Sequence, residues 1–448
     1  MIKRLLTLLC MQLAFCYTTV ATNYLTFTAE EDSAAFSIED HNIKSNIFYS
    51  LDNGKTWNKL TDQPVKLAKG NRALLKGGKP DKTPSWDKYS NFKMEGAIAA
   101  SGSIMSLVDE NGEGKTIPYA YCFYNLFENC TGLTKAPKLP AKILEYACYE
   151  GMFSECTSLA QAPELPATTL ARSCYYEMFK ECSNLTKVPE LPATTLAEWC
   201  YRYMFLGCTS LTQAPKLPAT TLAEDCYEGM FANCTSLKKT PELPATTLAA
   251  GCYSAMFGGC TSLKQAPKLP ATTLAEQCYG RMFNGCTSLT QAPQLPATTL
   301  AERCYEGMYS ECTSLTQAPQ LPATTLAEGC YEEMFANCTS LKKTPELPAT
   351  TLAAGCYSAM FVGCTSLKQA PKLPAKTLAE GCYSTMFSGC TKLSRIKVAF
   401  TDWGTGTDFW LDDVAENGTF VCPKDLPKEY GKHYIPEGWK VVNEDTSK

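Results

Sequence analysis

Cysteine is the residue type with the greatest capacity for chemistry in this sequence, and its spacing is regular. Of the 25 cysteines, all except Cys10, Cys16 and Cys422 fall in pairs that recur every 26 residues from Cys122 to Cys390. Within each pair, the second cysteine follows the first by eight residues. Thiols can form disulfides, bind metal ions or pack as small apolar side chains. The secondary structure that carries each pair sets the distance between the two thiols and so determines which of these roles is possible.

The pair Cys226 and Cys234 illustrates the geometry. On one α-helix, eight residues at ~1.5 Å of rise per residue would place these cysteines about 12 Å apart, which is too far for a disulfide. Equivalent cysteines of neighbouring repeats would stack about 5 Å apart, but a row of identical thiols cannot all pair simply along one line. No Cys-x-x-Cys motif or histidine accompanies them. We predict free, buried thiols, with disulfides between repeats as the alternative, and neither a metal nor a cofactor.

The other groups that could perform catalysis are sparse. The chain has only two histidines, His41 and His433, and both lie outside the repeats. Its net charge of −4 offers no basic face for a phosphate backbone, so we expect no nucleic-acid partner. The glutamates of the repeat recur with its period, so they supply no single carboxylate pair in a cleft. We predict no catalytic residues.

The repeat itself is clearest in residues 226–249, which read CYEGMFANCTSLKKTPELPATTLA. A fixed period of this length indicates a solenoid, because one unit cannot bury its apolar face alone. Apolar residues recur in steps of four at Leu222, Cys226 and Met230, after a threonine and glutamate that match a capping box, and this pattern predicts a short amphipathic helix.

The predicted helix should end at Asn233, in a left-handed conformation. Glycine takes this place in several repeats, namely Gly207, Gly259, Gly285, Gly363 and Gly389. Glutamate takes it in others, namely Glu155, Glu181 and Glu311, which breaks the pattern of the cap. The second half of the unit contains Pro241 and Pro244, which favour extended backbone but remove hydrogen-bond donors, so any strand there should be brief and imperfect.

The segment Met-Phe-x-x-Cys-Thr-Ser-Leu of residues 256–263 resembles the core of the BspA-like leucine-rich repeats of bacterial surface proteins. Methionine replaces the usual alanine, the period is longer, and a Pro-x-Leu-Pro segment replaces a more β-branched strand. The resemblance implies an α/β leucine-rich-repeat solenoid of about eleven units with 26 residues each. It also implies adhesion or surface binding.

Four domains are predicted. Residues 1–21 match a secretory signal peptide cleaved after Ala21, with lipid attachment at Cys16 as the alternative. Short runs of alternating polarity in residues 22–118 predict a β-sandwich-like domain. The leucine-rich-repeat solenoid occupies residues 119–393. After Leu393 the rhythm stops, and residues 394–448 should form a C-terminal β cap.

The octet of residues 50–57, Ser-Leu-Asp-Asn-Gly-Lys-Thr-Trp, looks like the Asp-box of sialidases and related β-propellers. A propeller enzyme would carry several copies, whereas this chain has one. We therefore interpret the octet as a β-hairpin with an Asn-Gly turn, and glycan contact by this domain remains an alternative.

One polar position of the repeat varies while its apolar positions hardly change. It follows the first proline of each unit and forms a ladder of Lys138, Glu164, Glu190, Lys216, Glu242, Lys268, Gln294, Gln320, Glu346 and Lys372. A second row alternates Lys135, Gln161, Lys187, Gln213, Lys239 and Gln265. These rows predict either a solvated face with ion pairs between repeats or a polar binding surface. A row of tyrosines from Tyr149 to Tyr383 could stack on sugars, although buried packing is the more common role.

We therefore expect an exported, non-enzymatic and monomeric surface protein. Its ladder would present a repeated surface to a protein or glycan ligand at the cell exterior. The alternatives are a carbohydrate-active accessory protein or hydrolase, and a structural surface spacer. No apolar stretch after the signal peptide reaches the ~20 residues that would span a membrane.

Overall fold

The computed structural model describes residues 23–109 and 111–444, and within these residues it contains strands and one short 3-10 helix but no α-helix. The elements are β1 (Leu25–Ala29), β2 (Ala34–His41), β3 (Ile47–Ser50), β4 (Asn58–Lys59), β5 (Val65–Leu67), β6 (Arg72–Gly77), β7 (Tyr89–Glu95), β8 (Ile98–Ser101), η1 (Ile104–Leu107), β9 (Leu133–Lys135), β10 (Lys372–Leu373), β11 (Arg395–Val398), β12 (Thr419–Pro423) and β13 (Lys440–Glu444). The predicted signal peptide, with Ala21 and Cys16, lies outside the described residues.

The described chain divides into two compact units. The first contains the residues up to Ala193 together with Gly207–Leu211, and the second contains Thr194–Leu206 together with the residues from Thr212 onward.

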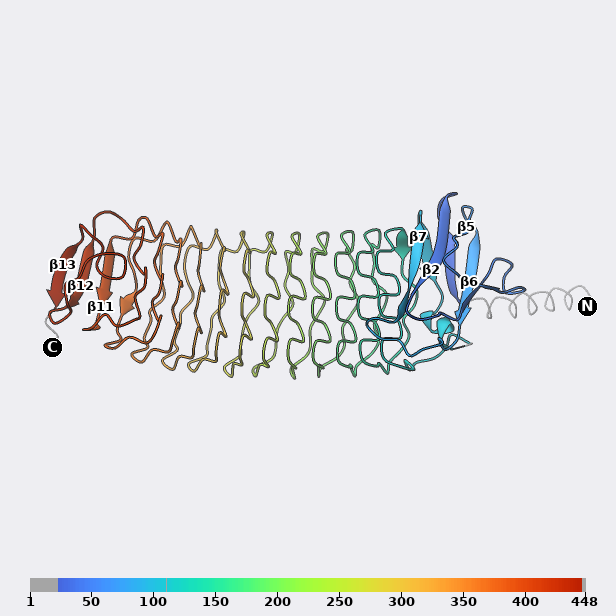
Figure 1. Cartoon of the computed structure of the whole chain (residues 1–448), viewed down its shortest axis with the longest axis horizontal. Helices are drawn as coiled ribbons and strands as arrows, with labels where there is room; N and C mark the ends of the chain where they lie inside the picture. Colours follow the sequence, from blue (N-terminus) through green and yellow to red (C-terminus); the bar gives the residue numbers. More distant parts are fainter. Residues whose placement is uncertain (1–22, 110, 445–448) are drawn as a thin grey trace, which may run out of the picture. The chain divides into compact units, whose positions relative to one another are not determined.

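Two β-sheets form the N-terminal part of the first unit (Figure 1). One sheet has the strand order β4-β3-β6-β1-β8-β9, and the other has the order β5-β2-β7. Their apolar residues share a core, in which the ring centroid of Phe27 from β1 lies 5.1 Å from those of Phe36 and Phe92 in the other sheet. This packing matches the predicted β-sandwich, because antiparallel strands with one apolar face must bury it against a second layer.

The first repeat continues the larger of these sheets. Strand β8 pairs in parallel with β9, which belongs to the repeat region, and the amide of Phe92 donates a hydrogen bond to the carbonyl of Leu126 at 2.8 Å. Phe27 also packs on Phe127, with 6.1 Å between ring centroids. The N-terminal sheets therefore cover the apolar end of the first repeat, as the end of a solenoid requires.

The octet of residues 50–57 is a structural hairpin loop. Asn53 and Gly54 both have positive φ, as an Asn-Gly turn between antiparallel strands requires. The carboxylate of Asp52 accepts hydrogen bonds from the amides of Lys55 and Thr56 and from the Thr56 hydroxyl, and these donors hold the pKa of Asp52 well below its usual range. Asp52 therefore shapes the loop.

Each repeat, or rung, contains a run of tight turns in the place of the predicted helix. In the rung of Cys226, residues Asp225, Gly229 and Asn233 all have positive φ, at 48°, 55° and 58°. The amide of Met230 bonds the carbonyl three residues before it, at 3.2 Å, whereas the next amide, of Phe231, bonds the carbonyl of Met256 in the following rung at 2.9 Å. Successive backbone amides thus donate hydrogen bonds alternately to a carbonyl of their own rung and to a carbonyl of the next rung.

The prediction of a short helix in each unit was therefore wrong. An α-helix bonds every interior amide to the carbonyl four residues earlier and has no left-handed residues inside it. A left-handed residue at every fourth position reverses the chain locally, so side chains repeat with a period of four and not 3.6. We call this segment, residues 225–234 and its equivalents, the turn run. Figure 1 accordingly draws the rungs as coils without helical ribbons.

The left-handed conformation predicted at Asn233 is confirmed, although it caps no helix. It also occurs at Glu155, Glu181 and Glu311, with φ of 61°, 57° and 62°, so this feature is uniform where the sequence predicted an interruption. Strands in the proline-rich half are as brief as predicted. Gln213 and Lys239, for example, form an isolated parallel bridge.

The middle left-handed position of the turn run is a glycine in the rung of Cys226 for a steric reason. At Gly229 an added Cβ atom would lie 2.2 Å from Cε1 of Tyr203 in the preceding rung, because that tyrosine side chain covers the glycine. The equivalent residue Glu333 follows Gly307, which has no side chain to interfere. A large residue at position 229 would therefore need a small one at position 203.

We expect Gly229→Glu to lower the free energy of unfolding strongly in the parent protein. The same substitution should cost less in a protein that already carries Tyr203→Gly. The coupling should reach about 1 to 3 kcal/mol, as for other contacting pairs, because the tyrosine ring must leave its site. Urea denaturation of the four proteins measures it. Additive effects of the two substitutions would contradict the steric account.

Tyrosine and phenylalanine form buried stacks along the rungs. In the second unit, Tyr227 stacks on Tyr253 with ring centroids 5.8 Å apart, and Phe231 stacks on Phe257 at 5.7 Å. Each tyrosine of the predicted row, including Tyr149 and Tyr383, is about 1% exposed. The row belongs to the core and cannot stack on sugars, so the alternative of a sugar-binding tyrosine stripe was wrong.

All cysteines of the repeat pairs are free thiols, and so is Cys422. The second thiol of a pair donates a hydrogen bond to a phenylalanine carbonyl of the preceding rung, as from Cys234 to Phe205 at 3.1 Å. Burial raises the pKa of the thiols, for example to about 12 for Cys226 and Cys278. At neutral pH they are protonated and apolar, so they act as packing residues.

We expect the native protein to react slowly with a thiol reagent and the denatured protein to react at most of its 22 repeat cysteines without added reductant, where 22 is the total of 25 less Cys10, Cys16 and Cys422. Mass spectrometry after alkylation counts the modified residues. A denatured protein in which these cysteines remain paired would contradict the structure.

The C-terminal residues continue the stack with shorter rungs, which corrects the prediction that the rhythm stops after Leu393. The parallel strands β10, β11, β12 and β13 follow one another in a single sheet. Trp410 donates a hydrogen bond from Nε1 to the carbonyl of Tyr434, 24 residues later, at 2.9 Å, and Trp403 bonds Pro427 in the same way at 3.0 Å. The repeat was recognised from its cysteine pairs, which end at Cys390, so the continuation of the rungs with a 24-residue spacing was not recognised from the sequence.

Candidate ligand-facing surface

The ladder residues lie in the proline-rich half of each rung, and their side chains point to the opposite face of the backbone from the buried leucines. Each ladder residue stands between a proline and a leucine, and its side chain is exposed while that leucine is buried. This arrangement follows from the extended backbone that the prolines impose, since successive side chains then point to opposite faces. All ten positions are exposed: Lys138, Glu164, Glu190, Lys216, Glu242, Lys268, Gln294, Gln320, Glu346 and Lys372.

Shallow grooves run between neighbouring rungs at this position. One groove in the first unit is lined by Lys138 and Glu164, and the centre of a water molecule can occupy about 690 Å³ of it. In the second unit, grooves beside Lys268 and Gln294 and beside Glu346 and Lys372 offer about 630 and 650 Å³. The prolines of adjacent rungs form apolar parts of the walls. Each groove thus combines an apolar wall with an exposed polar row.

The charged side chains of the ladder form no ion pairs in the described part of the chain. Ion pairs of the repeats lie instead on the turn runs, as between Arg202 and Glu228 at 3.0 Å and between Arg281 and Glu306 at 2.9 Å. The ladder therefore keeps unpaired charges and amides that a ligand can contact. Side chains of the second row, such as Gln161 and Lys187, are exposed as well, while their backbones form the bridges between rungs.

The structure brings no catalytic constellation together around the histidines. His41 stacks on Tyr89, with 4.5 Å between ring centroids, and His433 lies 3.1 Å from Asp408. Within residues 23–109 and 111–444, no cluster of three or more His, Cys, Asp or Glu side chains could hold a metal ion. No helix within these residues is long and apolar enough to cross a membrane.

One pair of carboxylates was missed from the sequence. Burial, followed by the charge of Glu177, raises the pKa of Glu150 to about 7. Glu177 forms an ion pair with Lys180 at 3.0 Å, and neither glutamate lines the grooves described above. The raised pKa of Glu150 is therefore explained by packing on the turn runs of neighbouring rungs, away from these grooves.

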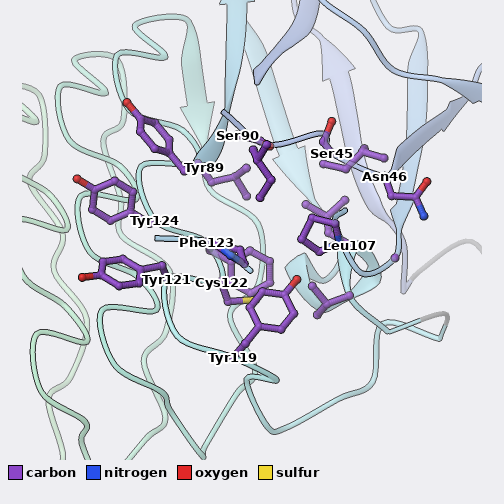
Figure 2. A pocket seen from close by; sticks show the side chains of 17 residues that line it. Ser45, Asn46, Tyr89, Ser90, Leu107, Tyr119, Tyr121, Cys122, Phe123 and Tyr124 are labelled. Atoms are coloured by element: carbon purple, nitrogen blue, oxygen red, sulfur yellow. The ribbon is translucent and has the colours of Figure 1, made fainter. Parts of the chain in front are cut away.

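Sequence reasoning also missed a hollow at the first rung, where Tyr119, Tyr121 and Tyr124 meet Tyr89 and Ser90 of β7 (Figure 2). The signal was present in the sequence, because the first unit carries tyrosines at positions where most later units have other residues. The segments that line the hollow are far apart in the chain, so the sequence did not reveal that they meet.

Comparison with known proteins identifies the repeats. The model of the BspA type leucine rich repeat region matches in six copies, over residues 119–264, 224–368 and 303–401. No curated protein matches. A search of solved structures finds the crystal structure of a TLR13-ssRNA13 complex, at 13% identity and a TM-score of 0.23, covering 73% of this chain. The chain spans 45% of the length of that structure's chain.

The matched ranges together extend from residue 119 to residue 401, which is more than half of the 448 residues. They coincide with the rungs, the turn runs and the ladder. The buried Met, Phe, Cys and Leu side chains of residues 256–263 are the motif that first indicated this relationship. The chain belongs to the family of BspA type leucine rich repeat proteins.

Proposed function

We propose that this protein is an exported, non-enzymatic surface protein whose ladder binds a protein or glycan ligand at the cell exterior. The observation that carries the proposal is the exposed ladder of unpaired Lys, Glu and Gln residues, which varies from rung to rung above a nearly invariant core. Variation at exposed positions above a nearly invariant core is expected where a scaffold stays constant and its contacts differ.

The chemistry of the rungs supports binding over catalysis. From Cys130 onward the repeat cysteines are buried and protonated, and the tyrosines of the row from Tyr149 to Tyr383 are core residues, so neither group is available to a substrate. The ladder offers both charge signs and neutral amides beside apolar proline walls. Such a mixed surface suits an extended ligand that contacts several rungs with similar weak interactions, as solenoids do with their long surfaces.

Export and a position at the cell surface form part of the same proposal. They rest on the basic and apolar pattern of residues 1–21 and on the family, whose members are typically surface or secreted proteins. The domain limits of residues 22–118, 119–393 and 394–448 are likewise proposed from the sequence. The protein would act as a monomer without a cofactor.

An array of glycans and extracellular matrix proteins, probed with the full chain, tests this function. We expect binding to at least one of them, and a weakening of that binding as the salt concentration rises, because exposed charges are screened. Heat-denatured protein is the control. Absence of binding to every member of the array would favour the structural spacer. Release of soluble sugars from a bound glycan would favour the hydrolase.

A further inference from the structure

The hollow at the first rung has a composition unlike that of the ladder grooves. It is lined by 17 residues, among them Ser45, Asn46, Tyr89, Ser90, Tyr119 and Tyr124. None of these side chains carries a charge at neutral pH, whereas each ladder groove is lined by at least one lysine. The hollow should therefore reject phosphates and carboxylates, which it could not neutralise.

Aromatic rings form one side of this hollow. Figure 2 shows Tyr89, Tyr124 and Tyr121 one above another, with their hydroxyls on the side away from Asn46 and Leu107. The ring centroids of Tyr89 and Tyr124 lie 5.1 Å apart, and those of Tyr121 and Tyr124 lie 5.5 Å apart, both in edge-to-face contact. His41 stacks behind Tyr89. These contacts fix the rings, so a ligand meets a rigid aromatic wall.

Polar atoms face the hollow from the other sides. The hydroxyls of Ser45 and Ser90 both donate to the carboxylate of Asp40, at 3.2 and 2.8 Å, which leaves their oxygen lone pairs to accept hydrogen bonds. The exposed amide of Asn46 can donate and accept. The ring of Tyr119 closes the lower side in Figure 2, with its hydroxyl pointing toward Leu107.

We propose that this hollow is a binding site for a neutral pyranose sugar, such as the end of an uncharged glycan. A sugar ring combines an apolar C–H face with hydroxyls that both donate and accept, and the tyrosine wall and the polar side match these two features. The centre of a water molecule can occupy about 50 Å³ of the hollow, less than the roughly 150 Å³ of a cavity that encloses one benzene ring, so one edge of a pyranose would enter it and the rest of the sugar would lie outside. This site is separate from the ladder, and neither depends on the other.

Saturation-transfer NMR and calorimetry with the full chain test the proposal, using methyl glycosides of glucose, galactose and N-acetylglucosamine and, for comparison, glucuronate. We expect saturable binding of at least one neutral sugar and none of glucuronate. Tyr119→Phe keeps the ring but removes its hydroxyl, so it should weaken binding about 5- to 10-fold, the equivalent of one net hydrogen bond of about 1 kcal/mol.

A blocking variant provides the second arm. Asn46 is exposed at the rim, so Asn46→Trp should fold normally and abolish sugar binding, whereas Asn58→Trp, at an exposed residue of the edge strand β4, should bind like the parent. Charge reversals on the ladder should leave sugar binding unchanged, which separates this site from the proposed function. The proposal fails if no neutral sugar binds, if Asn46→Trp binds normally, or if only indole or phenol binds, as expected for a site that takes an aromatic side chain of a partner protein.

Discussion

Raising the pH to 10 should unfold this protein completely, because its buried repeat thiols stay protonated only in the folded state. Burial raises the pKa of the repeat thiols, to about 12 for Cys130, Cys148, Cys182 and others, whereas an unfolded thiol has a pKa of about 8.5. Below pH 8.5 both states are protonated, and the thiols cause no pH dependence. Above it, only the unfolded state loses protons, so stability falls as the pH rises toward the native pKa values.

The size of the effect comes from repetition. At pH 10 each buried thiol lowers the free energy of unfolding by about 2 kcal/mol. The pKa of the unfolded thiol lies about 1.5 units below this pH, and each unit corresponds to about 1.4 kcal/mol. Each 26-residue rung carries two such thiols and so loses about 4 kcal/mol, which matches or exceeds the roughly 1 to 4 kcal/mol expected for 26 residues at about 0.05 to 0.15 kcal/mol per residue. Buried tyrosines add to this at higher pH, because their pKa values are raised by burial as well.

Circular dichroism and intrinsic fluorescence between pH 7 and 12, with a non-thiol reductant present, measure the transition. We expect its midpoint between about pH 9 and 10. A chain with fewer rungs should show nearly the same midpoint, because stability and ionisation both scale with the number of rungs. That shorter chain is the control. A protein that keeps its native spectrum at pH 11 would show that the thiols are not buried in the way described here.

The second large effect concerns deletions in the repeat. Removing residues 226–329, four rungs or 104 residues, joins Asp225 to Cys330, and both flanks lie in the second unit. The residue before Cys330 remains left-handed after the deletion, because Asp225 takes the place of Gly329 and their φ angles are 48° and 56°. Each remaining rung finds the same hydrogen-bond partners, so the shortened protein should fold with only modestly lower stability.

One contact at the junction needs adjustment. In the shortened chain, Tyr203 would precede Glu333, although its side chain occupies the space over Gly229 in the parent. We therefore expect the deletion to be more stable when it also carries Glu333→Gly. Removing only residues 226–238, which is half a rung, should instead prevent folding beyond the cut, because it places an extended segment against a turn run.

Thermal melts of the three deletions, followed by circular dichroism, compare them directly. The 104-residue deletion with Glu333→Gly should melt cooperatively within a few degrees of the parent, and the 13-residue deletion should show no native transition beyond the cut. Equal damage from both lengths would mean that the rungs are not independent repeating units.

Much of the fold could be predicted from the sequence because its repetition identifies which positions are buried. The Cys, Met, Phe and Leu rows of residues 226–237 are all buried, as their invariance indicated. The helix prediction failed because residues such as Cys226 and Met230 are spaced by four, which is close enough to 3.6 to suggest a helix over this length. Residues such as Glu177 and Arg281, which seldom adopt positive φ, hid the left-handed positions.

The surface was harder to predict than the core. Exposure of the ladder followed from variation at one position, and the structure shows side chains such as Lys216 and Glu242 to be exposed and unpaired. The hollow beside Tyr119 could not be predicted, since Ile43, Pro84 and Leu107 approach it from separate segments. Periodicity reveals what recurs, whereas this hollow occurs at the end of the stack, where the repeat meets a different fold.

The affinity of one charge-reversed variant for the ligand found on the array tests the central claim most directly, namely that the ladder carries the binding function. The variant is Lys216→Glu, Glu242→Lys and Lys268→Glu together. A matched control, Lys142→Glu, Glu276→Lys and Lys376→Glu, changes the net charge by the same amount at exposed residues outside the ladder. Both should melt at nearly the parent temperature, since exposed charges contribute little stability.

We predict that the ladder variant binds at least tenfold more weakly than the parent, while the control binds normally. The measurement is calorimetric titration of the parent, the ladder variant and the control under identical salt conditions. Unchanged affinity in the ladder variant, together with loss of binding when Asp52 and Trp57 of the N-terminal hairpin are replaced, would show that the rungs are only a stalk and would contradict the proposed function.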